Sequence, residues 1–460
     1  MSTPLQAATS QVVEEFSLST ETLRAIAAEF VVEAQRGLRL PGQSMPMLPS
    51  YVTSVPTGEE KGVFLAVDLG GTNLRVCSVH LDGNGKFKIV ASKSPLTKKL
   101  MTGTAEGLFS FIAEQVRDFL AKHIDERFAE EQPHAGSTGH YFKLGFTFSF
   151  PVVQTGINSG TLLRWTKGFD IPDAIGPDVC ELLQEQLDKL KLPVHVAALV
   201  NDTVGTLLTR AYTSAGNGST IAGIILGTGT NCAYVEDRAA VTKLGDPTPA
   251  DRDIMIINIE WGSFNNNNTV LTRTPIDDAV DAETPNKGVH IFEKRVSGMF
   301  LGEIIRLLLL DLSAKGLIFC QPSHELLTPW TLDTSFLSAV ESDTSVDLST
   351  IESTVSSSLG LPTTLAERES IQQLVKIIGK RSAYLAAAII VGLLTQTKAL
   401  DKYPTVDIGM DGSVFQLYPG YASMIRDGLR ILLGKDASRV TIGLAEDGSG
   451  VGAALCALVA

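Results

Sequence analysis

Cysteine and basic residues are scarce in this sequence, and each shortage excludes a class of protein. Its 460 residues include 5 cysteines, which lie far apart and show no CxxC spacing of the kind that binds zinc or carries redox chemistry. Lysine and arginine number 38 against 51 acidic residues, so the net charge is −13. Nucleic acids and anionic membranes are bound through basic surfaces, which this balance disfavours. We therefore expect free thiols in the reducing cytoplasm and neither a nucleic acid nor a membrane as partner.

Long hydrophobic runs and flexible linkers are also missing. The apolar run Ala383–Leu394 is shorter than the roughly 20 residues that span a bilayer, and Lys380 and Lys398 flank it. The N-terminal residues lack the basic and apolar segments of a secretory signal. No proline- or serine-rich stretch divides the chain, although 44% of its residues are hydrophobic. These features predict a globular protein of two interleaved lobes in which Ala383–Leu394 is a buried helix.

Short apolar strands alternate with amphipathic helices along the chain, which is typical of an α/β fold. Strands are expected where apolar runs are short or alternate in period two, and helices where apolar residues recur every three or four positions. The predicted strands are Val63–Leu69, Leu74–Leu81, Lys143–Ser149, His195–Val200, Ile221–Leu226 and Cys232–Glu236. The predicted helices are Ala105–Phe128, Asp178–Lys191, Lys294–Leu312, Leu365–Gln396 and Tyr421–Leu433, after an N-terminal arm with helical spacing in Val12–Phe16 and Leu23–Leu38. Two polar stretches, Glu341–Ser358 and Asn265–Asn268, are predicted to be surface loops.

Two strand-turn-strand units resemble each other. LGGTN at Leu69–Asn73 and LGTGTN at Leu226–Asn231 each follow one apolar strand and lead into another. Glycines in these turns would bring backbone N–H groups close to phosphate oxygens, which a side chain would block. Neither turn matches GxxxxGK[ST] or GxGxxG, and a tight hairpin also requires glycine. The pair together favours two similar half-domains that bind phosphate, with Asp68 placed to orient a magnesium-bound water.

A carboxylate follows the predicted strand that ends at Val200, a usual position for catalytic groups in α/β folds. An alcohol that attacks phosphorus must lose its proton to a base, and Asp202 fits that role. The alternative is an N-cap, because Asn and Asp often start helices and a helical pattern begins at Val204. Both interpretations stay open, and Asn201 can be the cap while Asp202 is the base.

Several polar side chains lie within apolar segments, as a site for a polyol requires. They are Ser149 in FTFSFP, Thr166 and Lys167 in RWTKGF, Glu260 in INIEWGSF and Glu293 in HIFEKRVSG. The hydroxyls and the lysine can donate hydrogen bonds, and the glutamates can accept them. A solvated surface lysine and salt-bridged glutamates are the competing interpretations.

Nine segments resemble the eukaryotic hexokinase family, in the family's order. They are DLGGTNLRV, LGFTFSFPV, LLRWTKGF, LVNDTVGTLL, LGTGTN, INIEWGSF, FEKRVSGMFLGEIIR, GMDGSVFQLYPGY and LAEDGSGVGAAL. They extend from Asp68 to the C-terminal region, and LPSYVTSVPTG at Leu48–Gly58 extends the match upstream. The segment NSGTLLRWTKGF is nearest to fungal glucokinases.

The resemblance implies a two-lobed actin, Hsp70 and sugar-kinase (ribonuclease H-like) fold with ATP, Mg²⁺ and glucose in the cleft. Matched position by position, it implies that Asp202 and Lys167 are catalytic. It implies that glucose contacts Ser149, Thr166, Lys167, Asn201, Asp202, Asn231, Glu260 and Glu293. It implies that the phosphates meet Asp68, Gly70, Gly71, Thr72, Asn73, Arg75, Gly227, Thr228 and Gly229, and that the adenosine lies beside Gly412 and Ser413. No side chain is expected to bind the metal directly, although Asp68 could hold it through water.

The implied domains are discontinuous. A helical arm (1–60) would pack on the large domain (202–445), and the small domain (61–201) would receive a returning C-terminal helix (446–460). The implied reaction is phosphorylation of glucose at the 6-hydroxyl by ATP, the first step of glycolysis, with other hexoses as open alternatives. A catalytically silent sugar sensor on the same fold is the rival interpretation, but the intact Asp202 and glycine turns speak against it. The resemblance leaves monomer and homodimer open.

Overall fold

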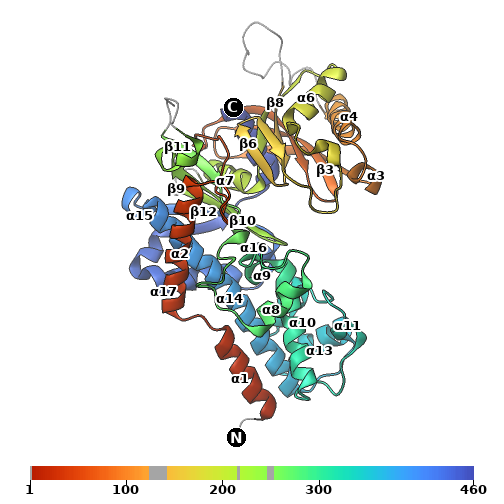
Figure 1. The fold of residues 1–460 in the computed structure, drawn as a ribbon, viewed down its shortest axis with the longest axis vertical. Coiled ribbons are helices and arrows are strands. Elements are labelled where there is room, and N and C mark those ends of the chain that lie inside the picture. The colour runs from red at the N-terminus through yellow and green to blue at the C-terminus, as the bar shows by residue number, and fades with distance from the viewer. Residues whose placement is uncertain (1–2, 124–141, 215–217, 246–252) are drawn as a thin grey trace.

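The computed structural model describes residues 3–123, 142–214, 218–245 and 253–460. Two β-sheets organise the molecule, one in the upper part of Figure 1 and one in its middle. The upper sheet has the strand order β4-β3-β2-β5-β8, and we call the part built on it the small lobe. The other sheet has the order β1-β11-β10-β9-β12-β13, and the part built on it is the large lobe.

The strands lie close to where the sequence predicts them. The small-lobe strands are β2 (Lys61–Leu69), β3 (Asn73–Asp82), β4 (Phe87–Pro95), β5 (Phe142–Phe148) and β8 (Val194–Val200), beside a separate hairpin of β6 (Val152–Gly156) and β7 (Ser159–Leu162). The large-lobe strands are β1 (Leu48–Pro49), β9 (Ser219–Leu226), β10 (Thr230–Asp237), β11 (Ile254–Asn258), β12 (Val406–Asp411) and β13 (Val440–Leu444). All six predicted strands are confirmed.

The two sheets have equivalent topology. In each, two antiparallel pairs (β4-β3-β2 and β11-β10-β9) are extended by two parallel strands (β5-β8 and β12-β13). The glycine turns predicted from LGGTN and LGTGTN therefore join equivalent strand pairs, β2 to β3 and β9 to β10. This confirms both the α/β class and the two similar half-domains.

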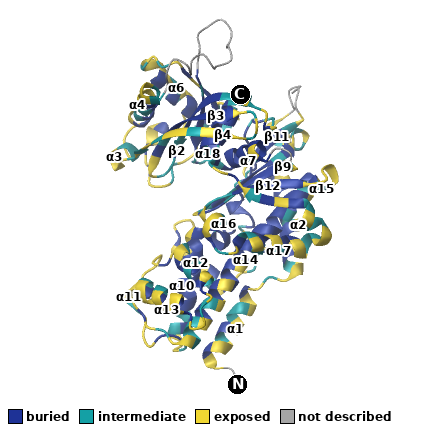
Figure 2. Cartoon of the chain, turned by 180° about the vertical axis from the view of Figure 1, so that it is seen from behind, coloured by how far each residue is buried: buried dark blue, intermediate teal, exposed yellow. Residues whose placement is uncertain are grey.

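Successive layers of helix and sheet build three cores. On the outer face of the small sheet, α4 (Ala105–His123) and α6 (Val179–Lys189) pack over alternate residues of β2 such as Leu65 and Val67. Between the sheets lie α7 (Asp202–Thr213) and α18 (Gly448–Val459), which contact the opposite β2 face at Phe64 and Ala66. The third core fills the outer side of the large sheet. Figure 2 shows these strands largely buried, while the edge strand β4 is partly exposed.

The two central helices touch through glycine. A Cβ on Gly452 of α18 would lie 2.1 Å from the Cα of Gly205 in α7, and one on Gly145 would lie 2.0 Å from the Ala453 carbonyl oxygen. No side chain fits at either place, so the helices approach each other and the small sheet backbone to backbone. Thr147 of β5 also donates a hydrogen bond of 2.8 Å to the Ser449 carbonyl. The last helix of the chain is thereby fixed to the first sheet.

Helices form the rest of the large lobe. They are α1 (Pro4–Phe16), α2 (Thr20–Arg39), α8 (Pro275–Glu283), α9 (Glu293–Val296), α10 (Gly298–Ala314), α11 (His324–Leu327), α12 (Thr334–Ser342), α13 (Ser349–Leu359), α14 (Leu365–Thr397), α15 (Ala399–Lys402), α16 (Ser413–Leu417) and α17 (Tyr421–Leu433), and α3 (Lys98–Met101) belongs to the small lobe. Of these, α14 is long and apolar enough to cross a bilayer, but 89% of its most apolar window is buried inside the protein. It packs against α1, α2 and α17 as a core helix, as predicted for Ala383–Leu394.

Three sequence predictions need correction. The stretch Glu341–Ser358 is not a loop, because it contains the end of α12 and most of α13, whose Ile351 and Val355 are fully buried at helical spacing among serines and threonines. The predicted helix Lys294–Leu312 is broken at Ser297 into α9 and α10. Asn265–Asn268 is a turn as predicted, but Asn265 is buried and its Oδ1 accepts hydrogen bonds from two backbone N–H groups. The end of Ala105–Phe128 beyond His123 lies outside the described residues.

Candidate active site in the cleft between the lobes

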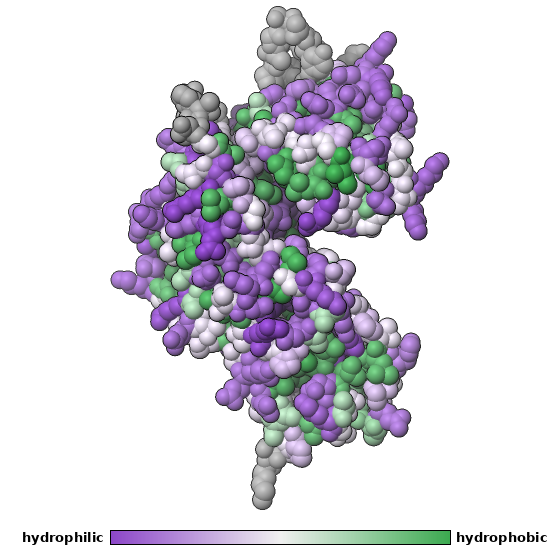
Figure 3. Space-filling model, in the orientation of Figure 1, coloured by the Kyte–Doolittle hydropathy of each residue, from purple (hydrophilic) through white to green (hydrophobic). Residues whose placement is uncertain are grey.

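Polar residues from both lobes gather where the parallel strands end. Ser149 follows β5, Asp202 follows β8, Gly227 follows β9 and Gly412 follows β12. In α/β folds such carboxyl ends are where ligands bind. A cleft of about 530 Å³ opens there, and Figure 3 shows the hollow between the two parts of the molecule. Of the predicted site residues, Ser149, Lys167, Asn201, Asp202, Gly227, Thr228, Gly229, Asn231, Glu260, Glu293, Gly412 and Ser413 line it.

The start of α7 separates the two interpretations of its first residues. Asn201 is the N-cap, since its Oδ1 accepts hydrogen bonds from the Thr203 backbone (3.0 Å) and hydroxyl (2.6 Å). Asp202 also accepts a hydrogen bond from the Thr203 N–H, of 2.9 Å to Oδ1, and it lines the cleft. Burial raises the pKa of Asp202, while the nearby Lys167 ammonium opposes the rise. Both predicted roles, cap and cleft carboxylate, fit this geometry.

Lys167 lies over the first glycine turn. Its Nζ donates a hydrogen bond of 2.8 Å to the Ser149 carbonyl and lies 5.3 Å from the centre of the Phe150 ring. A Cβ on Gly71 would lie 3.3 Å from the lysine stem, so the lysine passes close to the turn there. The backbone φ of Lys167 is 57°, an uncommon conformation for a non-glycine residue and one that often marks functional sites. Lys167 is exposed, as the competing interpretation of a surface lysine expects, but its Nζ is bonded to the Ser149 carbonyl.

On the large-lobe side, Glu260 belongs to an amide network. Its Oε1 accepts hydrogen bonds from Asn231 Nδ2 (3.0 Å) and Asn258 Nδ2 (2.9 Å), and its backbone N–H donates to Asn231 Oδ1. Glu260 also has a left-handed φ of 58°. Burial raises its pKa and the Asp202 charge adds to the rise, against the lowering effect of the amide bonds. Sequence reasoning missed Asn258, which is separated from Glu260 by one residue.

Glu293 faces the same cleft from α9. Its Oε2 accepts a hydrogen bond of 3.0 Å from the Thr230 backbone N–H, beside Gly229, where a Cβ would lie 2.9 Å from that oxygen. Burial raises the pKa of Glu293, and the Glu260 charge contributes. His290, which the sequence analysis did not select, places Nδ1 3.9 Å from Glu293 Oε1. The salt-bridge interpretation fails for Glu260, because no described lysine or arginine lies within ion-pair distance of it.

The remaining predicted phosphate ligands lie on the small lobe and do not line the cavity. At the β2–β3 turn these are Asp68, Gly70, Gly71, Thr72, Asn73 and Arg75. Arg75 is not free, because its guanidinium makes a two-pronged ion pair with Asp447 at the start of α18. Burial raises the pKa of Asp68, and Asp202 contributes to the rise. Thr166 does not line the cavity either.

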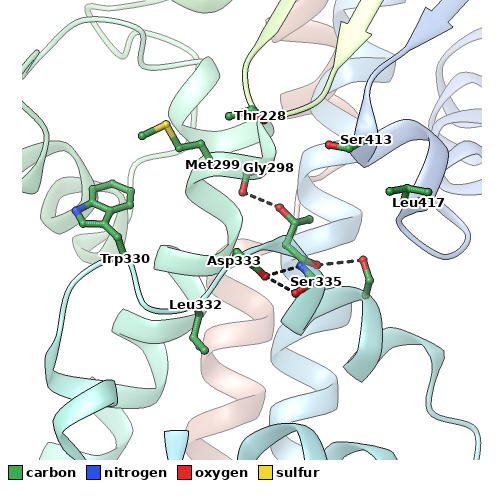
Figure 4. Close-up of a pocket in the computed structure, with 11 residues that line it drawn as sticks. Thr228, Gly298, Met299, Trp330, Leu332, Asp333, Ser335, Ser413 and Leu417 are labelled. Carbon is green, nitrogen blue, oxygen red and sulfur yellow. Dashed lines mark hydrogen bonds between the residues drawn. The ribbon is translucent and has the colours of Figure 1, made fainter. Parts of the chain in front are cut away.

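A second cavity, of about 560 Å³, continues from the cleft into the large lobe (Figure 4). Thr228 and Ser413 line both cavities, so the two are adjacent. Its walls are Gly298 and Met299 at the start of α10, the segment Trp330–Ser335 with Ser338, and Leu417. Apart from Thr228 and Ser413, sequence reasoning selected none of these residues. The segments that form the cavity are far apart in the chain. Met299 and Leu417 differ from other apolar residues only in being exposed, and exposure cannot be determined from the sequence.

A metal site made only of protein side chains is not found among the described residues, where no three His, Cys, Asp or Glu groups come together. The donors at the cleft nevertheless suit Mg²⁺, which prefers oxygen ligands and keeps several waters. Burial raises the pKa of both the Asp68 and the Asp202 carboxyl, and the Asp202 charge adds to the rise in the pKa of Asp68. A hydrated divalent cation between them would oppose these rises.

Known proteins resemble this chain over its whole length. Two family models described as hexokinase match residues 8–212 and 221–459. The glucokinase of Aspergillus niger is 44% identical, and the match covers 100% of this chain and 98% of that protein. Glucokinase-1 of Saccharomyces cerevisiae is also 44% identical, with 98% and 97% covered. A solved structure described as hexokinase from Schistosoma mansoni complexed with glucose has a TM-score of 0.83 at 34% identity and covers 100% of both chains.

Proposed function

The chain belongs to the hexokinase family, and from that premise we propose that it transfers the terminal phosphoryl group of ATP to the 6-hydroxyl of glucose. One observation carries the proposal. A buried carboxylate, Asp202, lies in one cavity with two further carboxylates, Glu260 and Glu293, and with the glycine turn of the large lobe. That combination suits an uncharged polyol next to a polyphosphate.

Asp202 is the proposed general base. A sugar hydroxyl is a weak acid, so it attacks phosphorus efficiently only if a positioned group accepts its proton as the new bond forms. Burial raises the pKa of Asp202 and thereby makes it a stronger base than an exposed aspartate. The proton would move from the 6-hydroxyl to a carboxylate oxygen of Asp202. Lys167 would stabilise negative charge on the transferred group, since its ammonium lies between Ser149 and the first glycine turn.

Glu260 and Glu293 are proposed to hold the sugar. Each has an oxygen that accepts hydrogen bonds from the protein, and neither forms an ion pair with a described lysine or arginine. Sugar hydroxyls can donate to such carboxylates and replace the lost water. Asn231, Ser149 and Asn201 would complete the polar lining, and Thr166 would contribute only after a movement of its loop.

The nucleotide is proposed to span both cavities. Its phosphates would lie between the two glycine turns, with Thr72, Asn73 and Arg75 approaching from the small lobe. Its adenosine would fill the cavity beside Ser413 and Met299. Asp68 and Asp202 would hold Mg²⁺ through water, and the ion would supply charge neutralisation to the β- and γ-phosphates. The domain division given above, and a cytoplasmic location consistent with five free cysteines, belong to the same proposal.

A coupled assay for ADP formation with glucose, mannose and fructose tests the proposal. We expect glucose to have a far higher kcat/KM than fructose, because the segment NSGTLLRWTKGF is nearest to fungal glucokinases. Glucose binding without turnover would indicate the silent sensor instead. Equal kcat/KM values for glucose and fructose would place the chain with general hexokinases.

A further inference from the structure

Part of the lining of the second cavity consists of hydroxyl groups, each of which already donates its hydrogen to another protein group. Thr334 Oγ1 donates to the Gly298 carbonyl (2.8 Å), and Ser338 Oγ donates to the Thr334 carbonyl (3.0 Å). The Ser335 hydroxyl and backbone N–H both donate to Asp333 Oδ1. Figure 4 draws these bonds as dashed lines. A hydroxyl has one hydrogen, so each of these three oxygens can only accept a further hydrogen bond.

Asp333 is a further hydrogen-bond acceptor in the lining of this cavity. It is the N-cap of α12 and lines the cavity, and both bonds from Ser335 reach one of its oxygens, Oδ1. The bonds from Ser335 lower its pKa, so the side chain is ionised at neutral pH and offers no donor. Apolar side chains complete the lining. Met299 and Leu332 belong to it, and the indole nitrogen of Trp330 lies on the side of the ring away from the cavity (Figure 4).

The nucleobases differ in what they present to such a surface. Adenine carries an amino group at position 6, which donates two hydrogen bonds, whereas guanine and hypoxanthine carry a carbonyl oxygen there, which only accepts. If the 6-carbonyl of guanine or hypoxanthine faced the Asp333 carboxylate and these hydroxyls, all the groups would be hydrogen-bond acceptors and no hydrogen bond could form. Asp333 and Ser335 are exposed in this structure, and a base bound in the cavity would cover them. A base without a donor at that place would displace water from these acceptors without replacing its hydrogen bonds, so it is expected to bind more weakly.

We propose that Asp333, supported by Ser335 and Ser338, is the specificity-determining residue that selects a 6-amino purine over a 6-oxo purine in the phosphoryl donor. The inference rests on the proposed function, because it takes the second cavity as the adenosine site. It concerns the base alone and gives Asp333 no part in phosphoryl transfer.

The chain offers a matched pair of variants. Residues 333–335 and 343–345 are both Asp-Thr-Ser, and Ser345 bonds to Asp343 as Ser335 bonds to Asp333. Asp333→Asn keeps an oxygen to cap α12, since Asn is also a good N-cap, but it adds an amide donor. Asp343→Asn makes the same change outside the cavity and loses a bond from the Ile351 N–H, so it also controls for reduced stability. Thermal unfolding would establish that both variants are folded.

The measurement is kcat/KM with glucose for ATP, for ITP and for purine riboside triphosphate, which carries only hydrogen at position 6. For the parent we expect ITP to be at least about tenfold worse than ATP, mainly through KM, with purine riboside triphosphate between them. Asp333→Asn should reduce the ATP-to-ITP ratio by about threefold or more, whereas Asp343→Asn should keep it. An unchanged ratio in Asp333→Asn, or a parent that uses both nucleotides equally, would overturn the inference.

Calorimetric titration of ADP and IDP separates the inference from the proposed function. ADP should bind the parent more tightly than IDP does, and the ratio of the two dissociation constants should be closer to one in Asp333→Asn. If no nucleotide supports phosphorylation of glucose, the kinase proposal fails, yet this ratio still tests base selection. Equal affinities for ADP and IDP in the parent would refute base selection even if the kinase is active.

Discussion

The two glycine turns share the letters GTN and join equivalent strands, but their surroundings differ. In the small lobe, Thr72 and Asn73 are exposed, Gly70 N–H donates to the Asn73 carbonyl, and the Thr72 carbonyl accepts a hydrogen bond from Leu96 N–H, just after β4. In the large lobe, the carbonyl groups of Gly227 and Thr228 accept hydrogen bonds from the first residues of α10, and Glu293 accepts one from Thr230 N–H. The large-lobe turn is therefore tied to two helices, α9 and α10, whereas the small-lobe turn is tied to the residue that follows the edge strand β4.

In the proposed function the two lobes have different tasks. The large lobe offers a surface on which Glu260, Glu293 and the second cavity adjoin. The small lobe carries Lys167 and the exposed turn, which we expect to approach the phosphates. Asp202 begins the helix that lies between the two sheets, so it is where the two regions meet.

Asp202 lies where the two lobes meet, and its removal should have the largest effect on the rate of phosphorylation. We expect Asp202→Ala to lower the rate of phosphorylation by about 10²-fold or more while glucose binding is retained, because the proposed proton acceptor is removed. Steady-state kinetics and calorimetry measure the two effects. Near-normal turnover would remove Asp202 from the role of base.

Removal of a large-lobe carboxylate tests whether that lobe binds sugar before the small lobe arrives. Glu260→Ala should weaken glucose binding by about 1–3 kcal/mol, since hydrogen bonds to a charged acceptor are lost. Glu293→Ala should do the same, and ATP affinity should change much less. Calorimetry with glucose alone is the measurement, and parent-like affinity in both variants would mean that the sugar pocket lies elsewhere.

Alanine substitutions at Gly412, which packs against the large-lobe turn, and at Gly71, in the small-lobe turn, measure how tightly each turn region is packed. A Cβ on Gly412, which has a φ of 100°, would lie 2.4 Å from the Leu226 carbonyl oxygen, so Gly412→Ala should cost about 2–4 kcal/mol of unfolding free energy. A Cβ on Gly71 meets only the flexible Lys167 stem at 3.3 Å, so Gly71→Ala should cost about 1 kcal/mol or less. Urea denaturation compares them. Equal losses would contradict the difference between the lobes.

Glucose should draw the lobes together, because its predicted ligands come from both. Small-angle scattering should show a smaller radius of gyration with saturating glucose, and ATP hydrolysis without sugar should be orders of magnitude slower than phosphorylation. Water would otherwise compete with the sugar for ATP. Unchanged scattering together with rapid hydrolysis without sugar would refute closure and leave the kinase proposal intact.

The smallest effect concerns pH. Burial raises the pKa of Glu260 above its ordinary value of 4.5, so the folded state binds that proton more tightly than the unfolded state does. Its contribution to stability therefore falls as pH rises from about 4.5 through the folded-state pKa. Glu260→Gln, which keeps an oxygen for Asn231 and Asn258, should match the parent Tm at low pH and exceed it by about 2–4 °C at pH 7. A Tm difference independent of pH would rule out this cause.

The sequence was informative where one local pattern determines one structure. Strand ends, both glycine turns and the side-by-side roles of Asn201 and Asp202 follow from neighbouring residues. It failed for α13, because serine and threonine suggested a loop while Ile351 and Val355 supplied a buried face at the helical repeat. It could not show that Arg75 is paired with Asp447, 372 residues away. The second cavity was missed for the same reason, since the start of α10, the segment before α12 and α16 meet only in the folded chain.

The position of α18 also determines the order in which the protein can mature on the ribosome. The small-lobe strands are complete at Val200, yet the helix that covers one face of their sheet comes much later, as the 302-residue separation of Thr147 and Ser449 shows. From Val200 to the end of α18 at Val459 there are 259 residues, so at a translation speed of about 5–20 residues per second that face waits roughly 13–52 s for its cover. During this interval Phe64 and Ala66 lack the contacts that α18 provides. We therefore expect a chain that is released before α18 is made to leave this face of its first sheet incompletely covered.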